Sequence, residues 1–547
     1  MIAKKQDNKI VISFNYDPFL VSFIKSLDGR KYNPATKAWF LPLANSALSV
    51  KRLAERGFRI EQELLDAVKA DESAAKEAEA LAIMPDTEFE TPLPLFPYQK
   101  VGASFLYKVG SGLLGDEMGL GKTIQMLALC EYVKAKKVLI FTPSSVKWQV
   151  AGEVKRFTDK EAVVIEGVPK ERCKLWDSLL VNDTCYVISN YEQLLRDFEK
   201  MSAIDWDVII ADEATRIANP SAKQSRLIKK LKAKRRIAMT GTPVSNRANE
   251  IWNIVDFTNP GALGDYWNFL NRYCLKNQFG GIYAYQNMDE LAAKLKRYMI
   301  RRLKVDVLPE LPEKICTDIP FDLTDEEKKL YKSLKKELLF EIAKTDIEKI
   351  ETPMTIQYTL VKMLRLRQLA DSMELLGVQA KSSKLDVLRD LLSEALDNNN
   401  KKAIIFTQFS QMADILEREL ADYKPLKISG TIKEEYRDVV DKFNKQEENR
   451  VLVMTSAGQF GLNIQRASVI FHYDQEWSLA KMQQREGRAH RFGQKDTVMV
   501  YNLLAKGTVD YYVQKVLHKK AELSGQLLGD IPMNMDNIRE ALSEEPY

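Results

Sequence analysis

Residues 115–123, "GDEMGLGKT", have most features of a loop that binds nucleotide phosphates. The strict pattern requires Gly, four residues and then Gly-Lys-Ser/Thr, but its first position here is Asp116. The loop's remaining glycines would let the backbone turn its N–H groups towards phosphate oxygens. We expect Lys122 to reach the β- and γ-phosphates and Thr123 to bind Mg²⁺.

Two acidic residues follow an apolar run further along the chain, in "DVIIADEA". At the end of a buried strand, Asp212 would hold Mg²⁺ and Glu213 would orient or deprotonate an attacking water. The alternative is a capped strand end with two solvated acids. The glycine loop upstream favours the catalytic interpretation.

A third motif, "QREGRAHRFGQ", is rich in arginine. The spacing of Arg488 and Arg491 would place both on one face of a helix. An arginine supplied by an opposite lobe can neutralise charge on a transferring phosphoryl group. The alternative is a basic surface helix that contacts solvent or a phosphate backbone.

Short apolar runs that end in polar residues alternate with helical segments from residue 93 onwards, and a second such series begins near residue 380. Ligands of open parallel sheets bind at the carboxyl ends of the strands, so a cleft between two α/β lobes is expected. The predicted domains are a small α+β domain at 1–60, an acidic linker at 61–92, a first lobe at 93–245, helical insertions and an interlobe connection at 246–379, a second lobe at 380–520 and a tail at 521–547.

These motifs resemble those of the Swi/Snf-type ATPases of helicase superfamily two, across about residues 93–520. "DEMGLGKT" is that family's usual phosphate loop, so Asp116 is the norm at this place. "YMIRRLKVDVLPELPEK" resembles the segment that joins the family's lobes. The resemblance implies an α/β fold of two RecA-like P-loop NTPase lobes that uses ATP and Mg²⁺. The implied ATP contacts are Gln99, Asp116, Glu117, Met118, Gly119, Leu120, Gly121, Lys122, Thr123 and Gln484.

Other segments resemble the family's DNA-facing motifs, among them "TPSSVKWQVAGEVKRF", "SNYEQL", "IIFTQFSQMADIL" and "TSAGQFGLNIQRA". The candidate DNA contacts in them are Ser144, Lys147, Trp148, Asn190, Tyr191, Gln408, Ser410 and Ser456. Packing or capping is the alternative role of each. Two positions depart from the family: Thr215 stands where His is usual, and Ser245 where Gln is common.

Residues 1–60 carry 11 Lys and Arg against 4 Asp and Glu, whereas residues 61–90 carry 2 against 10. The acidic stretch is predicted to be a solvated helix and linker, with a surface helix of one continuous domain as the alternative. "RKYNPATKAW" resembles the HARP domain found before the motor of annealing helicases. Trp39 is expected in the core rather than stacked on bases. Candidate phosphate contacts are Arg30, Lys31 and Lys37.

The composition of the 547-residue chain, with 45% apolar and 29% charged residues, is typical of globular domains without a membrane span or secretory signal. Scattered cysteines argue against disulfides and zinc, and no metal beyond Mg²⁺ carried with ATP is predicted. The favoured function is a DNA-dependent ATPase that translocates on duplex or branched DNA and remodels or reanneals it, with displacement of bound proteins and a nucleotide-switched scaffold as alternatives. We expect a monomer in the cytoplasm, associated with the nucleoid, with single-stranded-DNA-binding, replication or repair proteins as partners.

Overall fold

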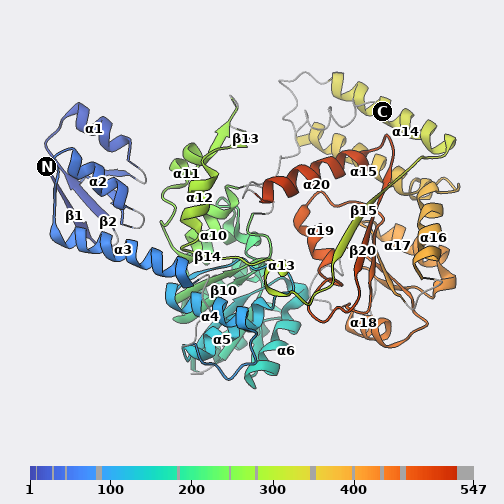
Figure 1. Ribbon diagram of the computed structural model, residues 1–547, viewed down its shortest axis with the longest axis horizontal. Coiled ribbons are helices and arrows are strands. Elements are labelled where there is room, and N and C mark those ends of the chain that lie inside the picture. The colour runs from blue at the N-terminus through green and yellow to red at the C-terminus, as the bar shows by residue number, and fades with distance from the viewer. Residues whose placement is uncertain are drawn as a thin grey trace. The chain divides into compact units, whose positions relative to one another are not determined.

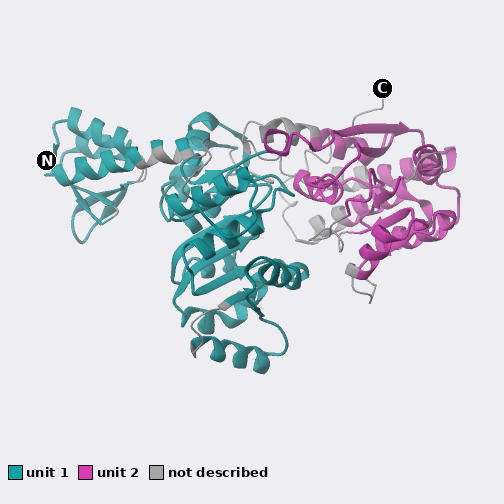
Figure 2. Cartoon of the chain, turned by 60° about the horizontal axis from the view of Figure 1, so that its bottom comes forward, with its two compact units in different colours: residues 1–303, 524–529 teal, residues 304–523, 530–547 magenta. Residues whose placement is uncertain are grey.

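In the computed structural model the chain forms two compact units, residues 1–303 with 524–529 and residues 304–523 with 530–547 (Figure 2). The residues described are 1–7, 9–27, 30–43, 46–81, 89–181, 185–244, 248–277, 281–344, 353–396, 401–430, 436–455 and 464–525. Among the described helices, none combines the length and apolar character that crossing a bilayer requires.

The first unit begins with an N-terminal module, residues 1–81, in which Figure 1 labels β1, β2 and the helices α1 to α3. The module is built on a five-stranded sheet of order β3-β4-β2-β1-β5. Its elements are β1 Ile2–Gln6, β2 Lys9–Ser13, α1 Pro18–Lys25, β3 Lys31–Asn33, β4 Ala38–Pro42, α2 Ala47–Glu55, β5 Arg59–Ile60 and α3 Gln62–Leu81. Helix α1 begins where the Asp17 carboxylate accepts the N–H groups of Phe19 and Leu20. The module thus combines a sheet with helices, as the α+β prediction for residues 1–60 requires.

Helix α3 occupies much of the segment expected to be an acidic linker. Its first two turns belong to the module, because Leu64 and Val68 are buried in the same core as Ile10 and Leu53. Its later part contacts the rest of the unit through an ion pair between Asp71 and Arg297, at 2.5 Å. The acidic composition of this stretch concealed the few apolar positions that anchor it.

The rest of the first unit, which we call the first lobe, is built on a parallel sheet of order β14-β6-β11-β10-β7-β9-β8. Its strands are β6 Gly112–Leu114, β7 Lys137–Phe141, β8 Ala162–Val164, β9 Cys185–Ser189, β10 Trp206–Asp212, β11 Ala233–Met239 and β14 Met299–Ile300, with a separate hairpin of β12 Cys274–Lys276 and β13 Ile282–Tyr285. Its helices are α4 Pro97–Val109, α5 Lys122–Tyr132, α6 Lys147–Thr158, α7 Pro169–Val181, α8 Tyr191–Ser202, α9 Lys223–Ile228, α10 Glu250–Thr258, α11 Tyr266–Tyr273 and α12 Met288–Leu295.

Both faces of this sheet are covered. Ile209 and Ala211 of β10 lie in one apolar core, and Val208 and Ile210 lie in the other. Alternate residues of a strand point to opposite faces, so burial on both sides requires a continuous apolar run. That requirement explains why "VIIA" and "VLIF" were recognisable as strands. Because β7 and β10 pair in parallel, their carboxyl ends lie at one edge of the sheet.

The second unit, residues 304–523, is described here as the second lobe. Its parallel sheet has the order β15-β20-β19-β16-β18-β17. The strands are β15 Lys314–Phe321, β16 Ala403–Phe406, β17 Leu426–Ile428, β18 Val451–Met454, β19 Val469–His472 and β20 Val498–Ala505. The helices are α13 Lys304–Val307, α14 Asp325–Lys344, α15 Pro353–Asp371, α16 Ser383–Leu396, α17 Ser410–Glu419, α18 Tyr436–Lys445, α19 Leu479–Glu486 and α20 Val509–Gly525.

Strand β15 lies in the segment that the sequence assigned to helical insertions and the interlobe connection. It pairs with β20 along its whole length, from Lys314 opposite Val498 to Phe321 opposite Ala505. Most of its side chains are exposed or half-buried, as an edge strand allows. It therefore lacks the apolar run that marked the central strands.

Candidate active site

The loop at 115–123 leads directly into α5, which begins at Lys122. Gly119 and Gly121 have φ values of 89° and 71°, in the left-handed region that favours glycine. A Cβ at Gly121 would lie 2.4 Å from Nε2 of Gln99, so the Gln99 side chain packs closely against the turn. The N-terminus of an eleven-residue helix thus follows a tight backbone turn, which is the geometry of a phosphate-binding loop.

The Lys122 ammonium lies at the centre of this loop. Its Nζ donates to the carbonyl oxygens of Asp116, at 2.9 Å, and of Glu117, at 3.3 Å. Burial lowers the pKa of Lys122, and the carboxylates of Glu213, Asp116 and Asp212 oppose that shift. The structure therefore brings the lysine of α5 together with the acidic pair at the end of β10.

Asp212 is held in a fixed orientation at the carboxyl end of β10. Its Oδ2 accepts from the Thr142 hydroxyl at 3.0 Å, and its Oδ1 accepts from the Glu213 N–H at 3.0 Å. Burial raises its pKa, whereas the Thr142 hydrogen bond and the Lys122 charge lower it. The Tyr191 hydroxyl donates to the Asp212 carbonyl at 2.6 Å, which fixes the backbone as well.

Glu213 adopts a left-handed conformation, with φ 48° and ψ 56°. Such a conformation is uncommon for a residue other than glycine and is found mainly where function or tight turns require it. The Thr215 hydroxyl lies 3.5 Å from the Glu213 carbonyl oxygen, at the limit of a hydrogen bond. Thr215, which departs from the family's usual histidine, thus contacts the backbone of the acidic pair.

The oxygen donors present suit Mg²⁺, which favours one or two carboxylates together with substrate phosphates. Asp212 would supply the carboxylate and Thr123, in the first turn of α5, the hydroxyl. Magnesium would neutralise phosphate charge there. Among the described residues, no group of three or more His, Cys, Asp or Glu side chains is placed to hold a metal by itself.

Asp116, the residue at the place of the missing glycine, carries a fully buried carboxylate. Arg302 binds it in two places, with Nε to Oδ1 at 2.9 Å and Nη2 to Oδ2 at 2.5 Å. Gln125 closes the triad, since its Nε2 donates to Asp116 at 3.0 Å and its Oε1 accepts from Arg302 at 2.9 Å. A Cβ at Gly102 would lie 2.4 Å from the Arg302 guanidinium. The absence of a side chain at Gly102 therefore leaves room on α4 for this group.

Arg301, beside Arg302, joins the phosphate loop to the segment after β11. Its Nη1 donates to the Gly115 carbonyl at 2.8 Å and to the Gly241 carbonyl at 3.2 Å. A Cβ at Gly241 would lie 2.4 Å from Met118 of the loop, so the two segments touch. The sequence placed "RRLK" in the connection between lobes, and its contacts with the phosphate loop went unrecognised.

Gln99, predicted on the adenine side, is buried in α4. Its Oε1 accepts from the Phe96 N–H at 3.0 Å, and its Nε2 donates to the Leu120 carbonyl at 3.2 Å. It therefore ties the start of α4 to the phosphate loop. Burial raises the pKa of the neighbouring Tyr98 to about 12, so its hydroxyl is neutral near pH 7.

In the second lobe, α19 ends at Glu486, so Arg488 and Arg491 lie in the turn beyond it. The expectation that they share one face of a helix was wrong; Gly487 follows as the C-cap, and the following residues turn. Arg485 is fully buried and donates to the Asp474 carbonyl at 3.0 Å and to Glu476 at 3.3 Å. Its role inside this lobe is structural.

The loop that contains Arg488 and Arg491 is connected to the start of the second lobe. Lys304 is buried and donates from Nζ to the His490 carbonyl at 2.6 Å. The His490 ring lies 2.9 Å from the Pro312 carbonyl oxygen. Gln484 is also buried, near the end of α19.

Several candidate DNA contacts have partners within their own lobe. Lys147 donates to the Ile165 carbonyl at 2.9 Å, and Asn190 donates to the Ser144 hydroxyl at 3.2 Å. Gln408 donates to the Gln475 carbonyl at 2.6 Å. Of the remaining candidates, Tyr191 is buried, whereas Trp148 is 58% exposed and donates a hydrogen bond to Glu166. Ser410 is exposed at the start of α17. Ser456 lies outside the described residues, and so does Ser245, the second position that departs from the family.

The three cations predicted to contact DNA phosphates, Arg30, Lys31 and Lys37, differ in their contacts and exposure. Arg30 donates to the Leu27 carbonyl at 3.0 Å and so closes the end of α1. Lys31 pairs with Asp265 of the first lobe at 2.7 Å. Lys37 is exposed in the turn between β3 and β4, with φ 49°.

Comparison with known proteins gives two domain matches. Residues 38–375 match the SNF2-related domain, and residues 383–493 match the helicase conserved C-terminal domain. The first match begins in β4 of the N-terminal module.

Similar proteins include the putative ATP-dependent helicase/translocase YwqA of Bacillus subtilis, 32% identical over 79% of this chain and 49% of that protein. The ISWI chromatin-remodeling complex ATPase ISW1 of Saccharomyces cerevisiae is 28% identical over 78% of this chain and 40% of its own length. The chain thus spans half or less of these relatives. A solved Sulfolobus solfataricus SWI2/SNF2 ATPase core in complex with dsDNA is 30% identical, covers 82% of this chain and 96% of that one, and has a TM-score of 0.39. Since the SNF2-related match covers more than half of its residues, this chain belongs to the SNF2-related family.

Proposed function

We propose that this protein is a DNA-dependent ATPase that translocates on duplex or branched DNA and remodels or reanneals it. The observation that carries the proposal is the convergence of Lys122 with Asp212 and Glu213 at one edge of a parallel sheet. A glycine turn that ends in a helix N-terminus lies at the same place. Few chemistries other than nucleotide phosphate hydrolysis use this combination.

Each of these groups has a distinct role in the proposed reaction. Lys122 and the backbone N–H groups of the loop bind the β- and γ-phosphates. Glu213 orients the attacking water and accepts its proton, and the geometry of Asp212 is maintained by Thr142. Arg491 and Arg488 of the second lobe complete the site by stabilising charge on the transferring phosphoryl group. The support for this last assignment is the sequence pattern "QREGRAHR".

DNA is the proposed partner for two reasons. Relatives of this chain are described as a putative ATP-dependent helicase/translocase and a chromatin-remodeling complex ATPase. The N-terminal module is also strongly basic over residues 1–60. We assign it a HARP-like role, in which it directs the lobes to forks or junctions during replication or repair.

The test is the steady-state ATPase rate of the full chain without DNA and with single-stranded, duplex and forked DNA at equal nucleotide concentration. Duplex or forked DNA should raise the rate. Glu213→Gln should still bind ATP but hydrolyse it about 10² to 10⁴ times more slowly, because it lacks the base. Glu199→Gln, an exposed carboxylate of α8, is the matched control. A rate that no DNA changes would favour a nucleotide-switched scaffold instead.

A further inference from the structure

The sheet of the N-terminal module has one covered and one open face. Ala3, Ile10, Ile12 and Leu41 lie in a core with α1, α2 and the start of α3. Because successive residues of a strand point to opposite faces, the neighbours of these residues form the other face. The module's core cluster draws on none of that second face. Val11 and Ala38 of the second face are buried, but its charged side chains Lys4, Lys9 and Arg59 are exposed, and we call it the open face.

The strand register defines the open face. One row across the sheet runs Lys4, Val11, Phe40 and Lys31, since these residues are directly opposite one another in β1, β2, β4 and β3. A second row joins Arg59, Ile2 and Ser13, and a third joins Gln6, Lys9 and Pro42. Directly opposite residues of paired strands share a face.

The charge of this face has a single sign. The five strands contain no Asp or Glu, and Lys4, Lys9 and Arg59 are exposed. Within the described part of the chain none of these three makes an ion pair, whereas Lys31 pairs with Asp265 and Lys5, on the covered side, pairs with Glu63. The open face therefore complements a polyanion.

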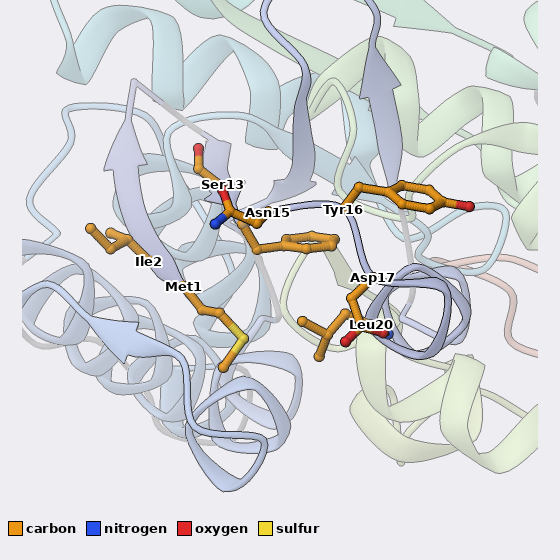
Figure 3. Close-up of a pocket in the computed structure, with 8 residues that line it drawn as sticks. Met1, Ile2, Ser13, Asn15, Tyr16, Asp17 and Leu20 are labelled. Carbon is orange, nitrogen blue, oxygen red and sulfur yellow. The ribbon is translucent and has the colours of Figure 1, made fainter.

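A pocket of about 530 Å³ adjoins the row that contains Ile2 and Ser13 (Figure 3). Its lining includes Ile2, Ser13, Asn15, Tyr16 and Asp17. The Tyr16 side chain extends away from the other labelled residues and is 84% exposed (Figure 3). The Asp17 carboxylate is engaged at the start of α1, at 2.8 Å from the Phe19 N–H.

We propose that the open face and this pocket bind single-stranded DNA, with phosphates on Lys4, Lys9 and Arg59 and a base against the exposed Tyr16 ring. A cationic track beside an exposed aromatic ring is the combination that binds unpaired strands, because a base must be unstacked to pack on a ring. The Asn15 amide offers hydrogen bonds to a base edge. The inference deepens the proposed function and rests on it, since it gives the module a preference for the single-stranded part of a fork.

The experiment measures binding of fluorescent oligo(dT) and of a duplex of equal length to the full chain without nucleotide, over a series of salt concentrations. Tyr16→Ala should weaken oligo(dT) binding about fivefold or more while duplex binding changes little. Tyr32→Ala is the matched control, because Tyr32 is exposed on the opposite face, beside Trp39. Thermal midpoints establish that each variant is folded.

Charge is tested by a pair of double variants. Lys4→Ala/Lys9→Ala should reduce the magnitude of the log–log salt slope for oligo(dT) by up to about 1.4, at roughly 0.7 per phosphate contact. Lys25→Ala/Lys51→Ala removes two exposed charges from α1 and α2 and should leave the slope nearly unchanged. Equal losses in both double variants would show only general attraction and overturn the proposal.

The proposal also fails if Tyr16→Ala leaves oligo(dT) binding unchanged or weakens duplex and single-strand binding alike. These outcomes differ from failure of the proposed function. Duplex-stimulated ATPase activity, measured on the same variants, tests the lobes alone and should remain at the wild-type level in all of them. Absence of DNA-stimulated turnover in the wild type would refute the proposed function even if oligo(dT) binding followed the expected pattern.

Discussion

At the scale of single residues, Asp116 shows how a departure from a motif can be structural. The strict phosphate-loop pattern would place glycine there, yet the Asp116 carboxylate pairs with Arg302 in a buried triad with Gln125. We predict that Asp116→Gly, which restores the pattern, damages the protein. It would leave the Arg302 guanidinium buried without its carboxylate, at a cost of about 3–5 kcal/mol.

Chemical unfolding of Asp116→Gly and of the double variant Asp116→Gly/Arg302→Leu measures this effect. Because the second substitution removes the uncompensated charge, the double variant should recover part of the lost free energy of unfolding. ATP affinity should fall in Asp116→Gly, since Arg302 also anchors Tyr98 and the Glu117 backbone. A single variant as stable as the wild type would show that the triad contributes little.

At the scale of elements, the strands that the sequence revealed were those buried on both faces. Strands β7, β10, β16 and β18 are continuous apolar runs because helices cover both sides of their sheets. Strand β15 was missed because an edge strand needs no such run. The prediction that Arg488 and Arg491 lie on one helix was wrong because α19 ends at Glu486, before both residues. A spacing of three residues does not by itself distinguish a helix from a turn.

Contacts made by distant residues were harder to foresee. The Arg302 triad joins positions far apart in sequence, and no spacing rule links them. The residues of the open face of the N-terminal sheet are set by the register of the strands. That its charged side chains are all cations can be recognised only when the pairing of β1 to β5 is known. By contrast Lys122, Asp212 and Glu213 were predictable. Phosphate chemistry requires these residue types, and in open parallel sheets the ligand binds at the carboxyl ends of the strands, where the three residues lie.

The edge strand β15 is tied to α19 by an ion pair between Lys314 and Glu486, at 2.5 Å. Although burial disfavours its charged form, Lys314 and His472 hold the pKa of Glu486 at about 2, below its ordinary 4.5. A lowered carboxyl pKa contributes stability that is fully present above pH 4.5 and is lost as pH falls towards 2.

We therefore predict that Glu486→Gln lowers the free energy of unfolding at pH 7, by on the order of 3 kcal/mol, and less at pH 3. Thermal midpoints of both proteins at the two pH values provide the measurement. Glu394→Gln, which removes an exposed carboxylate of α16, is the control. A gap between wild type and Glu486→Gln that widens on acidification would contradict the assignment.

At the scale of the whole molecule, the N-terminal module should be separable from the ATPase. Leu64 and Val68 of α3 belong to the module's core, so a deletion that ends at residue 60 would expose them. Deletion of residues 1–81 removes the module intact. We predict that this variant keeps most duplex-stimulated ATPase activity but binds forks more weakly and loses strand reannealing.

The comparison requires fork and duplex ATPase rates and annealing rates for the full chain and the deletion variant. Arg297 loses its partner Asp71 in the deletion, so an Asp71→Asn variant of the full chain serves as the control for that lost contact. Equal fork preference in the full chain and the deletion would place the preference in the lobes.

The central claim is that ATP hydrolysis on DNA needs residues from both lobes, and Arg491→Ala tests it most directly. The measurement is kcat at saturating ATP and saturating duplex DNA, with ATP affinity determined separately. Loss of an arginine that stabilises the transferring phosphoryl group should cost about 3 kcal/mol or more, a decrease in kcat of roughly 150-fold or greater. Lys495→Ala, an exposed cation a few residues further on, should leave kcat near the wild-type value. Wild-type turnover by Arg491→Ala on duplex DNA would contradict the account.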